Sequence, residues 1–183
     1  MVDSEKKIIK ACLQQKKAAQ YRLYAMFSKK MFGICLRYAG SFEEAQDILQ
    51  EGFVKVFQHL STFKGNGSLE GWIRKIIINT AIEKYRERIY HLPFDDLYDD
   101  EAVKQHDQAQ DSLHLKDLMS FVQKLPSQYR LVFNLYALEG YSHKEIGQAL
   151  QISESTSRSN LTRARLLLKE KLNKESELIL RVI

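Results

Sequence analysis

Hydrophobic positions recur with helical spacing along most of this chain. The clearest stretch is 43–60, where apolar residues follow one another at intervals of three or four positions and so form one face of a helix. Those residues are Ala45, Ile48, Leu49, Phe53, Val56, Phe57 and Leu60. Two further amphipathic stretches cover 4–17 and 21–38, and no segment alternates convincingly with period two. We therefore predict an all-α protein.

Helical periodicity returns after residue 112. One predicted helix covers 113–125 and ends at Pro126, because proline cannot continue a helix. The next covers 127–139, and Gly140 is well placed as its C-terminal stop.

The last part of the chain has the pattern of a helix-turn-helix. Ser142 is followed three residues later by Glu145, which is a capping box at the start of a short helix. A brief connection ends at Ser153, which can cap a long final helix over 154–172.

An acidic segment, 91–112, separates the two helical parts. It lacks apolar periodicity and carries seven acidic residues against Lys104 alone. The acidic residues are Asp95, Asp96, Asp99, Asp100, Glu101, Asp107 and Asp111. We predict two small helical domains, 1–90 and 113–183, joined by a flexible acidic linker.

Composition narrows the possible partners and the compartment. The net charge of +5 and the pI of about 9.1 favour a polyanionic partner such as nucleic acid. Cys12 and Cys35 fit no disulfide or zinc motif, so we expect buried thiols in a reducing compartment. The start of the chain lacks a signal peptide's apolar core, and no apolar run approaches the ~20 residues of a membrane span. We expect a cytoplasmic protein without membrane insertion.

Signatures of catalysis are missing from the sequence. No phosphate-binding loop, GxGxxG turn or EF-hand spacing occurs, and the five histidines are scattered without partners for metal or nucleophilic chemistry. The sequence predicts a protein that is not an enzyme and needs no cofactor or metal.

The helix-turn-helix offers a surface for duplex DNA. Small polar residues open its second helix and cations follow, so this helix can approach a major groove closely. The candidate residues are Ser155, Thr156, Ser157, Arg158, Asn160, Arg163 and Arg165. An ordinary α-hairpin with a solvated basic face remains the alternative at this point.

The stretch Phe63–Arg88 combines a Gly-punctuated loop with a helix that becomes increasingly basic. Aromatic, amide and cationic groups side by side suit the binding of unstacked bases and their phosphates. Trp72 and the neighbouring isoleucines can equally belong to the core.

Three carboxylates, Glu43, Asp47 and Glu51, lie one turn apart on the polar face of 43–60. Such a row is typical of a solvated face. A docking surface for a basic partner is the alternative, and Val54 beside it, outside the apolar stripe, would suit a protein interface.

Taken in order, four blocks resemble a sigma factor of bacterial RNA polymerase of the short extracytoplasmic-function (ECF) type, within the sigma-70 superfamily. The blocks are EEAQDILQEGFVKVF, FKGNGSLEGWIRKIIINTA, LPSQYRLVFNLYALEGYSHKEIGQAL and ISESTSRSNLTRARLLLKEKL. The resemblance covers roughly 18–89 and 113–173, with none of the extra regions of larger sigma factors. It implies region 2-like and region 4-like domains that bind core RNA polymerase and promoter DNA, under the control of an anti-sigma factor.

The resemblance also assigns residues to roles. It implies a polymerase-binding surface at Asp47, Gln50, Glu51 and Val54. It implies that Asn79, with Phe63, Lys64 and Asn66 of the loop, forms a pocket for a flipped base of the −10 element, while Lys75, Lys84 and Arg86 hold the DNA backbone. Duplex DNA at the −35 element would be read by the residues of the helix-turn-helix given above.

The recognition helix departs from the pattern of many relatives. Where they open with Val-Gly-Thr-Val-Arg-Ser-Arg, positions 154–160 read Glu-Ser-Thr-Ser-Arg-Ser-Asn. Promoter preference therefore cannot be carried over. A free-standing helix-turn-helix regulator and a purely protein-binding adaptor remain the other hypotheses.

Overall fold

The computed structural model describes residues 3–91 and 120–182, with side chains for 5–88 and 120–172. The chain divides into two compact units, Met1–Glu87 and Arg88–Ile183. Every regular element in the described ranges is helical, which confirms the all-α prediction. Apart from His91, the predicted acidic linker lies outside the described residues.

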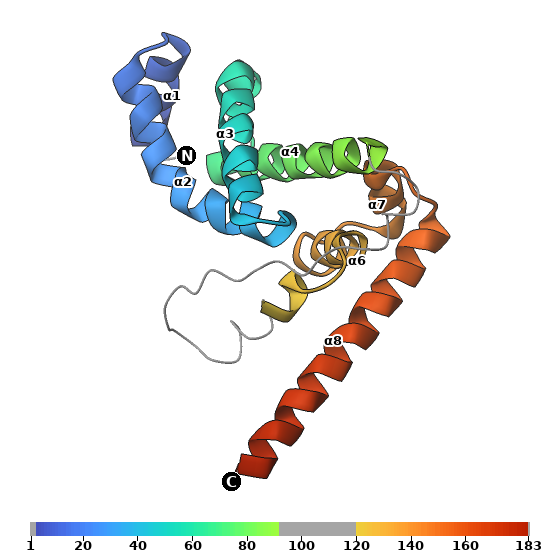
Figure 1. Cartoon of the computed structure of the whole chain (residues 1–183). Coiled ribbons are helices and arrows are strands. Elements are labelled where there is room, and N and C mark those ends of the chain that lie inside the picture. The colour runs from blue at the N-terminus through green and yellow to red at the C-terminus, as the bar shows by residue number, and fades with distance from the viewer. Residues whose placement is uncertain (1–2, 92–119, 183) are drawn as a thin grey trace. The chain divides into compact units, whose positions relative to one another are not determined.

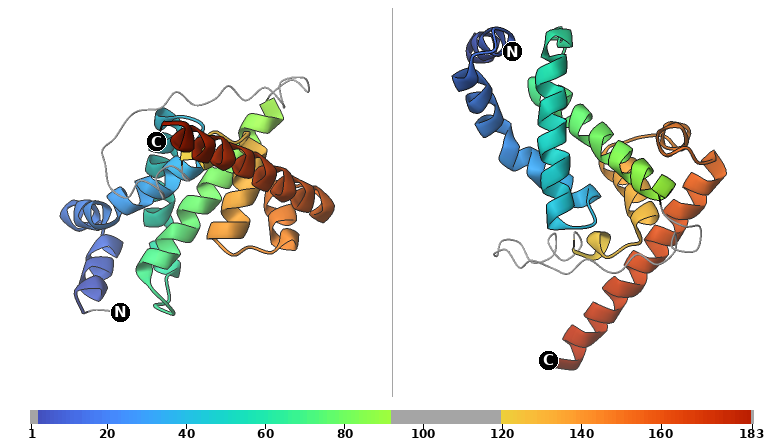
Figure 2. Two further views of the ribbon diagram at one scale, coloured as in Figure 1. Left: turned by 90° about the horizontal axis from the view of Figure 1, so that it is seen from below. Right: turned by 45° about the horizontal axis from the view of Figure 1, so that its top comes forward.

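The first unit is built from four α-helices and one short 3₁₀ turn (Figure 1). They are α1 (Asp3–Leu13), α2 (Lys17–Tyr38), α3 (Phe42–His59), η1 (Leu60–Thr62) and α4 (Leu69–His91). The helix α3 folds back beside α2, and α4 crosses α3 (Figure 2). The core between them includes the fully buried Leu23, Met31, Ile48, Ile73 and Ile77. The helices predicted over 4–17, 21–38 and 43–60 are thus present, with shifts of a few residues at their ends.

A glycine lets α3 and α4 approach closely. Gly52 is buried in the middle of α3, and a β-carbon built there would overlap the Cδ1 atom of Ile77 in α4. The two helices therefore meet where one of them has no side chain.

Side-chain caps fix where α3 and α4 begin. The Ser41 hydroxyl accepts a hydrogen bond from the Glu44 amide at 3.1 Å, at the N-terminus of α3. The Ser68 hydroxyl accepts one from the Gly71 amide at 3.0 Å, which confirms Ser68 as the cap of α4.

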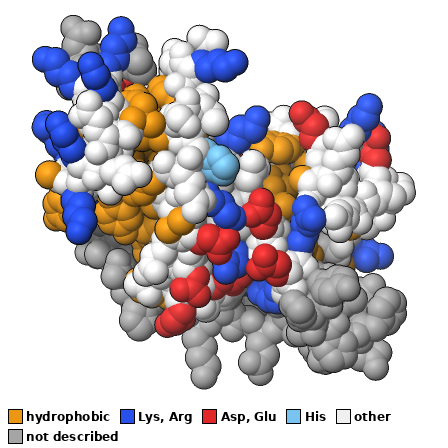
Figure 3. All heavy atoms as spheres, turned by 90° about the horizontal axis from the view of Figure 1, so that it is seen from above, with side chains coloured by type: hydrophobic (Ala, Val, Ile, Leu, Met, Phe, Trp, Pro, Cys, Tyr) orange, Lys and Arg blue, Asp and Glu red, His pale blue; other side chains and the backbone are white. Residues whose placement is uncertain are grey.

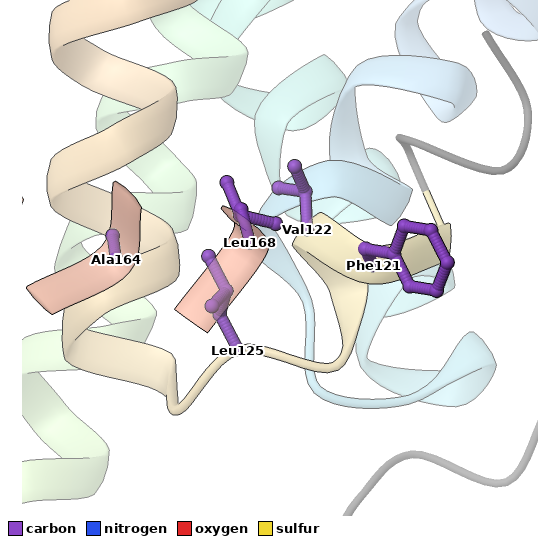
Figure 4. Packing of buried hydrophobic residues seen from close by; sticks show 5 residues of the cluster. All are labelled: Phe121, Val122, Leu125, Ala164 and Leu168. Carbon is purple, nitrogen blue, oxygen red and sulfur yellow. The ribbon is translucent and has the colours of Figure 1, made fainter. Parts of the chain in front are cut away.

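From residue 120 to residue 182, the second unit contains a helical turn at 120–123 and four further elements. These are α6 (Ser127–Phe133), the π-helical turn η3 (Asn134–Leu138), α7 (His143–Leu150) and α8 (Glu154–Val182). Its core joins Phe121, Val122 and Leu125 to Ala164 and Leu168 of α8 (Figure 4).

Two helices in the described part of the second unit differ from prediction, and residues 113–119 of the helix predicted over 113–125 lie outside the described residues. The predicted helix over 127–139 changes to π-helical geometry at Asn134, although Gly140, with φ of 75°, ends it as expected. The last helix, predicted to end near residue 172, continues to Val182.

The turn between α7 and α8 is tightly packed. Both hydrogen bonds of the predicted capping box are present at Ser142 and Glu145. A β-carbon on Gly147 would lie 2.9 Å from the carbonyl oxygen of Ile152, so the turn packs directly on the α7 backbone. The Ser153 hydroxyl accepts a hydrogen bond from the Thr156 amide at 3.0 Å and caps α8. This arrangement is the predicted helix-turn-helix.

Candidate nucleic-acid interface

The loop before α4 is flanked by two aromatic rings in contact, with their planes tilted by 51°. The Phe63 and Trp72 rings lie 5.5 Å apart between centroids, and both side chains are half-buried. Gly67 has a φ of 114°, which a residue with a side chain rarely adopts. Lys64 and Asn66 are exposed between these supports, so the loop presents an amide and an ammonium group on an aromatic base.

Helical spacing places three of the predicted DNA contacts on one face of α4. Asn79 lies one turn after Lys75, and Arg86 lies three turns after Lys75. All three side chains are exposed. This face carries two cations around an amide group, next to the loop, and can hold phosphates around an extruded base.

Lys84 does not share that face. It lies nine residues after Lys75, or two and a half turns, which directs it to the opposite side of α4. There its ammonium group contacts the Glu51 carboxylate of α3 at 2.8 Å. The structure thus brings a residue predicted to bind DNA against one predicted to bind the polymerase.

A network of ion pairs extends from this contact. Lys55 contacts Glu51 at 2.8 Å and Glu83 of α4 at 2.5 Å. Hydrogen bonds from Lys55 and Lys84 lower the pKa of the Glu51 carboxyl, and the hydrogen bond to Glu51 raises the pKa of Lys84. Burial opposes the charge on Lys55, but its hydrogen bonds to Glu51 and Glu83 outweigh burial and raise the pKa of Lys55. Acidic and basic side chains lie side by side on the face drawn in Figure 3.

The predicted docking residues share one face of α3. Positions 47, 50, 51 and 54 follow the i, i+3, i+4, i+7 spacing of such a face. Asp47, Gln50 and Val54 are exposed, Val54 by 53%, and Glu51 is half-buried in the ion-pair network. An exposed valine among carboxylate and amide groups is suited to a partner surface with both basic and apolar groups.

The start of α8 presents part of the predicted recognition surface. Ser155 and Arg158 are exposed, and Thr156 is half-buried with its hydroxyl 2.7 Å from that of Ser153. Arg158 is ion-paired with Glu154, one turn before it. The guanidinium is therefore held at the helix surface by an acidic neighbour.

The burial of Ser157 and Asn160 contradicts the prediction that they face a groove. Ser157 is 0% exposed, and its hydroxyl lies 3.0 Å from Nδ1 of His143 in α7. Asn160 is 4% exposed. Both belong to the stripe that continues through Leu161 and Ala164 into the core, and the i, i+3, i+4, i+7 spacing of that stripe was the available sequence signal.

The later cations of α8 are exposed and supported by tyrosines. Arg163 donates a hydrogen bond to the Tyr129 hydroxyl at 3.2 Å. The Arg165 guanidinium lies 5.7 Å from the centroid of the Tyr136 ring, within the range of a cation–π contact. These contacts orient both cations without neutralising them.

His143 and Tyr136 were missed by sequence reasoning, because a lone histidine and a lone tyrosine carry no motif. Their rings are stacked at 4.6 Å between centroids, so η3, α7 and α8 meet around them. Burial and the nearby Arg158 lower the pKa of His143. The neutral imidazole therefore acts as a packing and hydrogen-bonding group beside the recognition helix.

Other candidate chemistry is not supported within the described ranges. No group of three or more His, Cys, Asp or Glu side chains suited to a metal is found there. No helix in the described part of the chain is long and apolar enough to cross a membrane. Cys12 and Cys35 are buried, and burial raises the pKa of Cys35 to about 12, so this thiol is unreactive.

Comparison with known proteins finds the same two regions in the same order. A family model described as Sigma-70 region 2 matches residues 23–88, and one described as Sigma-70, region 4 matches residues 115–168. The chain is 26% identical over 175 residues to the RNA polymerase sigma-H factor of Pseudomonas aeruginosa, covering 89% of this chain and 91% of that protein. It is 26% identical over 182 residues to the ECF RNA polymerase sigma factor SigW of Bacillus subtilis, covering 90% and 97%.

A solved structure shares the fold. The sigma factor RpoE of Bartonella quintana, crystallised with the anti-sigma factor NepR, aligns with a TM-score of 0.55 over 84% of this chain and 96% of that chain. The two sequences are 21% identical, so this likeness concerns the fold alone.

Proposed function

Because this chain belongs to the sigma-70 family as an ECF-type RNA polymerase sigma factor, we propose specific tasks for each of its surfaces. The protein is a transcription initiation factor that directs RNA polymerase to promoters. The observation that carries the proposal is the presence of three polar surfaces. The α3 face and the loop with α4 lie in the first unit, and the start of α8 lies in the second.

The α3 face is the proposed docking site for core RNA polymerase. Asp47, Gln50 and Glu51 supply carboxylate and amide groups, and Val54 supplies an exposed apolar contact. A basic partner surface with an apolar centre would be complementary to it.

The loop with α4 is the proposed −10 site. Lys64, Asn66 and Asn79 would surround a base of the non-template strand, with Phe63 and Trp72 supporting the loop from behind. Unstacking a base costs a few kcal/mol, which hydrogen bonds and stacking in such a pocket can offset. Lys75 and Arg86, on the same face as Asn79, would hold the phosphates.

The start of α8 is the proposed −35 site. Ser155 and Arg158 would contact base edges or phosphates, and Thr156 would support the helix start through its contact with Ser153. Arg163 and Arg165 extend the cationic surface along the helix. Ser157 and Asn160 would support the recognition helix from inside.

This assignment implies partners and a compartment. The protein would act in the cytoplasm on promoter DNA with core RNA polymerase. An anti-sigma factor that covers some of these surfaces is a further proposed partner, since the solved structure of the Bartonella quintana relative contains one. No catalytic step by this chain and no cofactor are required.

Run-off transcription with purified core RNA polymerase tests the proposal. Fragmented genomic DNA of the source organism serves as template, and we expect discrete transcripts that require the added protein. If the protein binds duplex DNA by itself but yields no promoter-dependent transcript with core, it is a free-standing helix-turn-helix regulator. If it binds neither DNA nor core, the adaptor hypothesis replaces both.

A further inference from the structure

Two aromatic rings line one side of the recognition helix α8. The Tyr136 and His143 rings are stacked with their centroids 4.6 Å apart, and the Arg165 guanidinium lies 5.7 Å from the centroid of Tyr136. The Nδ1 atom of His143 lies 3.0 Å from the hydroxyl of Ser157, which is buried on α8. These contacts fix the imidazole where η3, α7 and α8 meet, with Nδ1 engaged and Nε2 on the opposite edge of the ring.

Charged groups of α8 surround His143. Burial and then Arg158 lower the pKa of His143, Glu154 opposes them, and Arg165 adds to the lowering. From η3, the group that faces the imidazole is the phenol of Tyr136. The imidazole is therefore neutral at neutral pH in the free protein, because two nearby arginines disfavour a third cation.

The helix-turn-helix brings this cluster to the DNA backbone. In this motif the second helix lies in the major groove, while the first helix crosses the phosphates. The side chain of Arg158 is 63% exposed, and Arg165 follows it by two turns on the same face of α8. His143 is the first residue of α7, is half-buried and lies within electrostatic reach of both arginines. A phosphate held by either arginine would therefore come close to the imidazole.

We propose that His143 is a further phosphate contact of the −35 site and takes up a proton from solvent when DNA binds. This inference rests on the proposed function, because it adds a residue to a surface assigned to DNA there. In the imidazolium both ring nitrogens donate hydrogen bonds, Nδ1 to the Ser157 hydroxyl and Nε2 to a phosphate oxygen. The proton turns a neutral packing group of the free protein into a third cation beside Arg158 and Arg165.

Proton uptake makes the DNA affinity depend on pH in a defined direction. A nearby phosphate favours the charged imidazole, so the pKa of His143 is higher in the complex than in the free protein. Well above the pKa of the complex, His143 is neutral in both states and the affinity is constant. As the pH falls through that pKa the affinity rises, and it levels off below the pKa of the free protein. The total gain is that of one solvent-accessible ion pair, roughly two- to fivefold.

The first test follows DNA binding by the full-length protein as a function of pH. The probe is a labelled duplex from the upstream part of a promoter that run-off transcription has identified. Fluorescence anisotropy at constant low ionic strength covers about pH 8.5 to about pH 5.5, which spans the ordinary histidine pKa of about 6.5. We expect wild type to bind roughly two- to fivefold more tightly at the acidic end of this range.

Two variants remove the proton site in different ways. His143→Gln keeps a hydrogen-bonding side chain, and His143→Phe keeps a ring that can stack on Tyr136. Both should match wild type at the alkaline end and lose the gain on acidification. The matched control is His59→Gln, which removes an exposed histidine of α3 and should keep the full gain. If both His143 variants keep the wild-type gain, with or without a uniform loss of affinity, His143 has only a packing role and the inference is overturned.

The second test counts the protons directly. Titration calorimetry of the same duplex in two buffers of different ionisation enthalpy gives the number of protons taken up on binding. We expect a larger uptake for wild type than for His143→Gln near the ordinary histidine pKa, and none of that difference at the alkaline end. If the promoter supports transcription but the two uptakes are equal, or the free protein does not bind the duplex, the inference fails and the proposed function stands. If wild type yields no promoter-dependent transcript with core RNA polymerase, the proposed function itself fails.

Discussion

At the scale of single residues, Asn79 offers a direct test of base capture. We expect Asn79→Ala to reduce promoter opening about fivefold, because one hydrogen bond of about 1 kcal/mol to an extruded base is lost. Permanganate reactivity of unpaired thymines measures opening, and anisotropy measures the affinity for core RNA polymerase. That affinity should stay within error of wild type, since Asn79 is exposed on the face of α4 that carries Lys75, away from the side on which Lys84 contacts Glu51.

A matched control for Asn79 lies on α3. Gln58 is likewise an exposed amide, and Gln58→Ala should change neither measurement. Equal loss of opening and core affinity in Asn79→Ala would instead indicate that Asn79 supports the fold of α4.

Arg158 tests the recognition helix at the same scale. Arg158→Ala should weaken binding of a −35 duplex by about 1–3 kcal/mol and relax the preference at one base pair, if the guanidinium contacts a base edge. Glu154→Gln should act in the opposite direction, because it releases Arg158 from its ion pair and removes a charge that repels phosphates. Binding is measured by competition with duplexes substituted at each −35 position.

The exposed Lys169, farther along α8, supplies the contrast to Arg158. Lys169→Ala should weaken binding to all duplexes alike, as expected for a phosphate contact. If Arg158→Ala behaves in the same uniform way, Arg158 contacts the backbone and does not read the sequence.

Residue types predicted which segments carry the candidate surfaces better than they predicted the direction in which each side chain points. Lys84 and Ser157 have the chemistry of DNA contacts, but neither presents it on an exposed DNA face. Lys84 is turned toward Glu51 by the crossing of α3 and α4, and that crossing depends on a long-range contact at Gly52. Ser157 lies on the buried stripe of α8. Periodicity alone would have placed it inside, but its polar side chain led to the prediction that it faces a groove.

At the scale of elements, the turn of the helix-turn-helix depends on a glycine in α7. Gly147→Ala places a β-carbon 2.9 Å from the Ile152 carbonyl oxygen, a backbone atom that cannot rotate away. We expect the strain to cost about 1–3 kcal/mol. The better helix propensity of alanine offsets up to about 1 kcal/mol of that cost. Chemical denaturation should show a lower free energy of unfolding, and affinity for a −35 duplex should fall with it.

A second glycine gives the opposite expectation. Gly33 in α2 is exposed, and a β-carbon there would meet nothing within 4 Å. Gly33→Ala should therefore raise the free energy of unfolding by about 0.5–1 kcal/mol through helix propensity alone. If Gly147→Ala also raises the free energy of unfolding, helix propensity rather than space governs both positions.

Local sequence signals predicted where helices begin. The capping residues Ser68, Ser142 and Ser153 each accept the predicted hydrogen bond, because a cap is decided by neighbours within four residues. The π-helical turn at Asn134 was not predicted, since the sequence NLYAL carries no local signal that separates it from an α-helix. The continuation of α8 past residue 172 was missed because its apolar periodicity weakens there.

At the scale of the whole molecule, the two units are joined in one chain, which keeps each near the partner that the other has bound. Tethering of two modules raises overall avidity by 10²–10⁴-fold without any new contact. We therefore expect that cutting the chain into 1–112 and 113–183 lowers promoter-dependent run-off transcription by about that factor at equal nanomolar concentrations. A matched variant with the linker lengthened to twice its size should lose far less, because doubling a loop costs only about 0.6 kcal/mol.

Circular dichroism of each fragment establishes that it remains helical. If the helical fragments together match the intact chain at nanomolar concentration, each binds the polymerase tightly by itself. The tether would then contribute no avidity, and promoter selection would depend on two independent docking events.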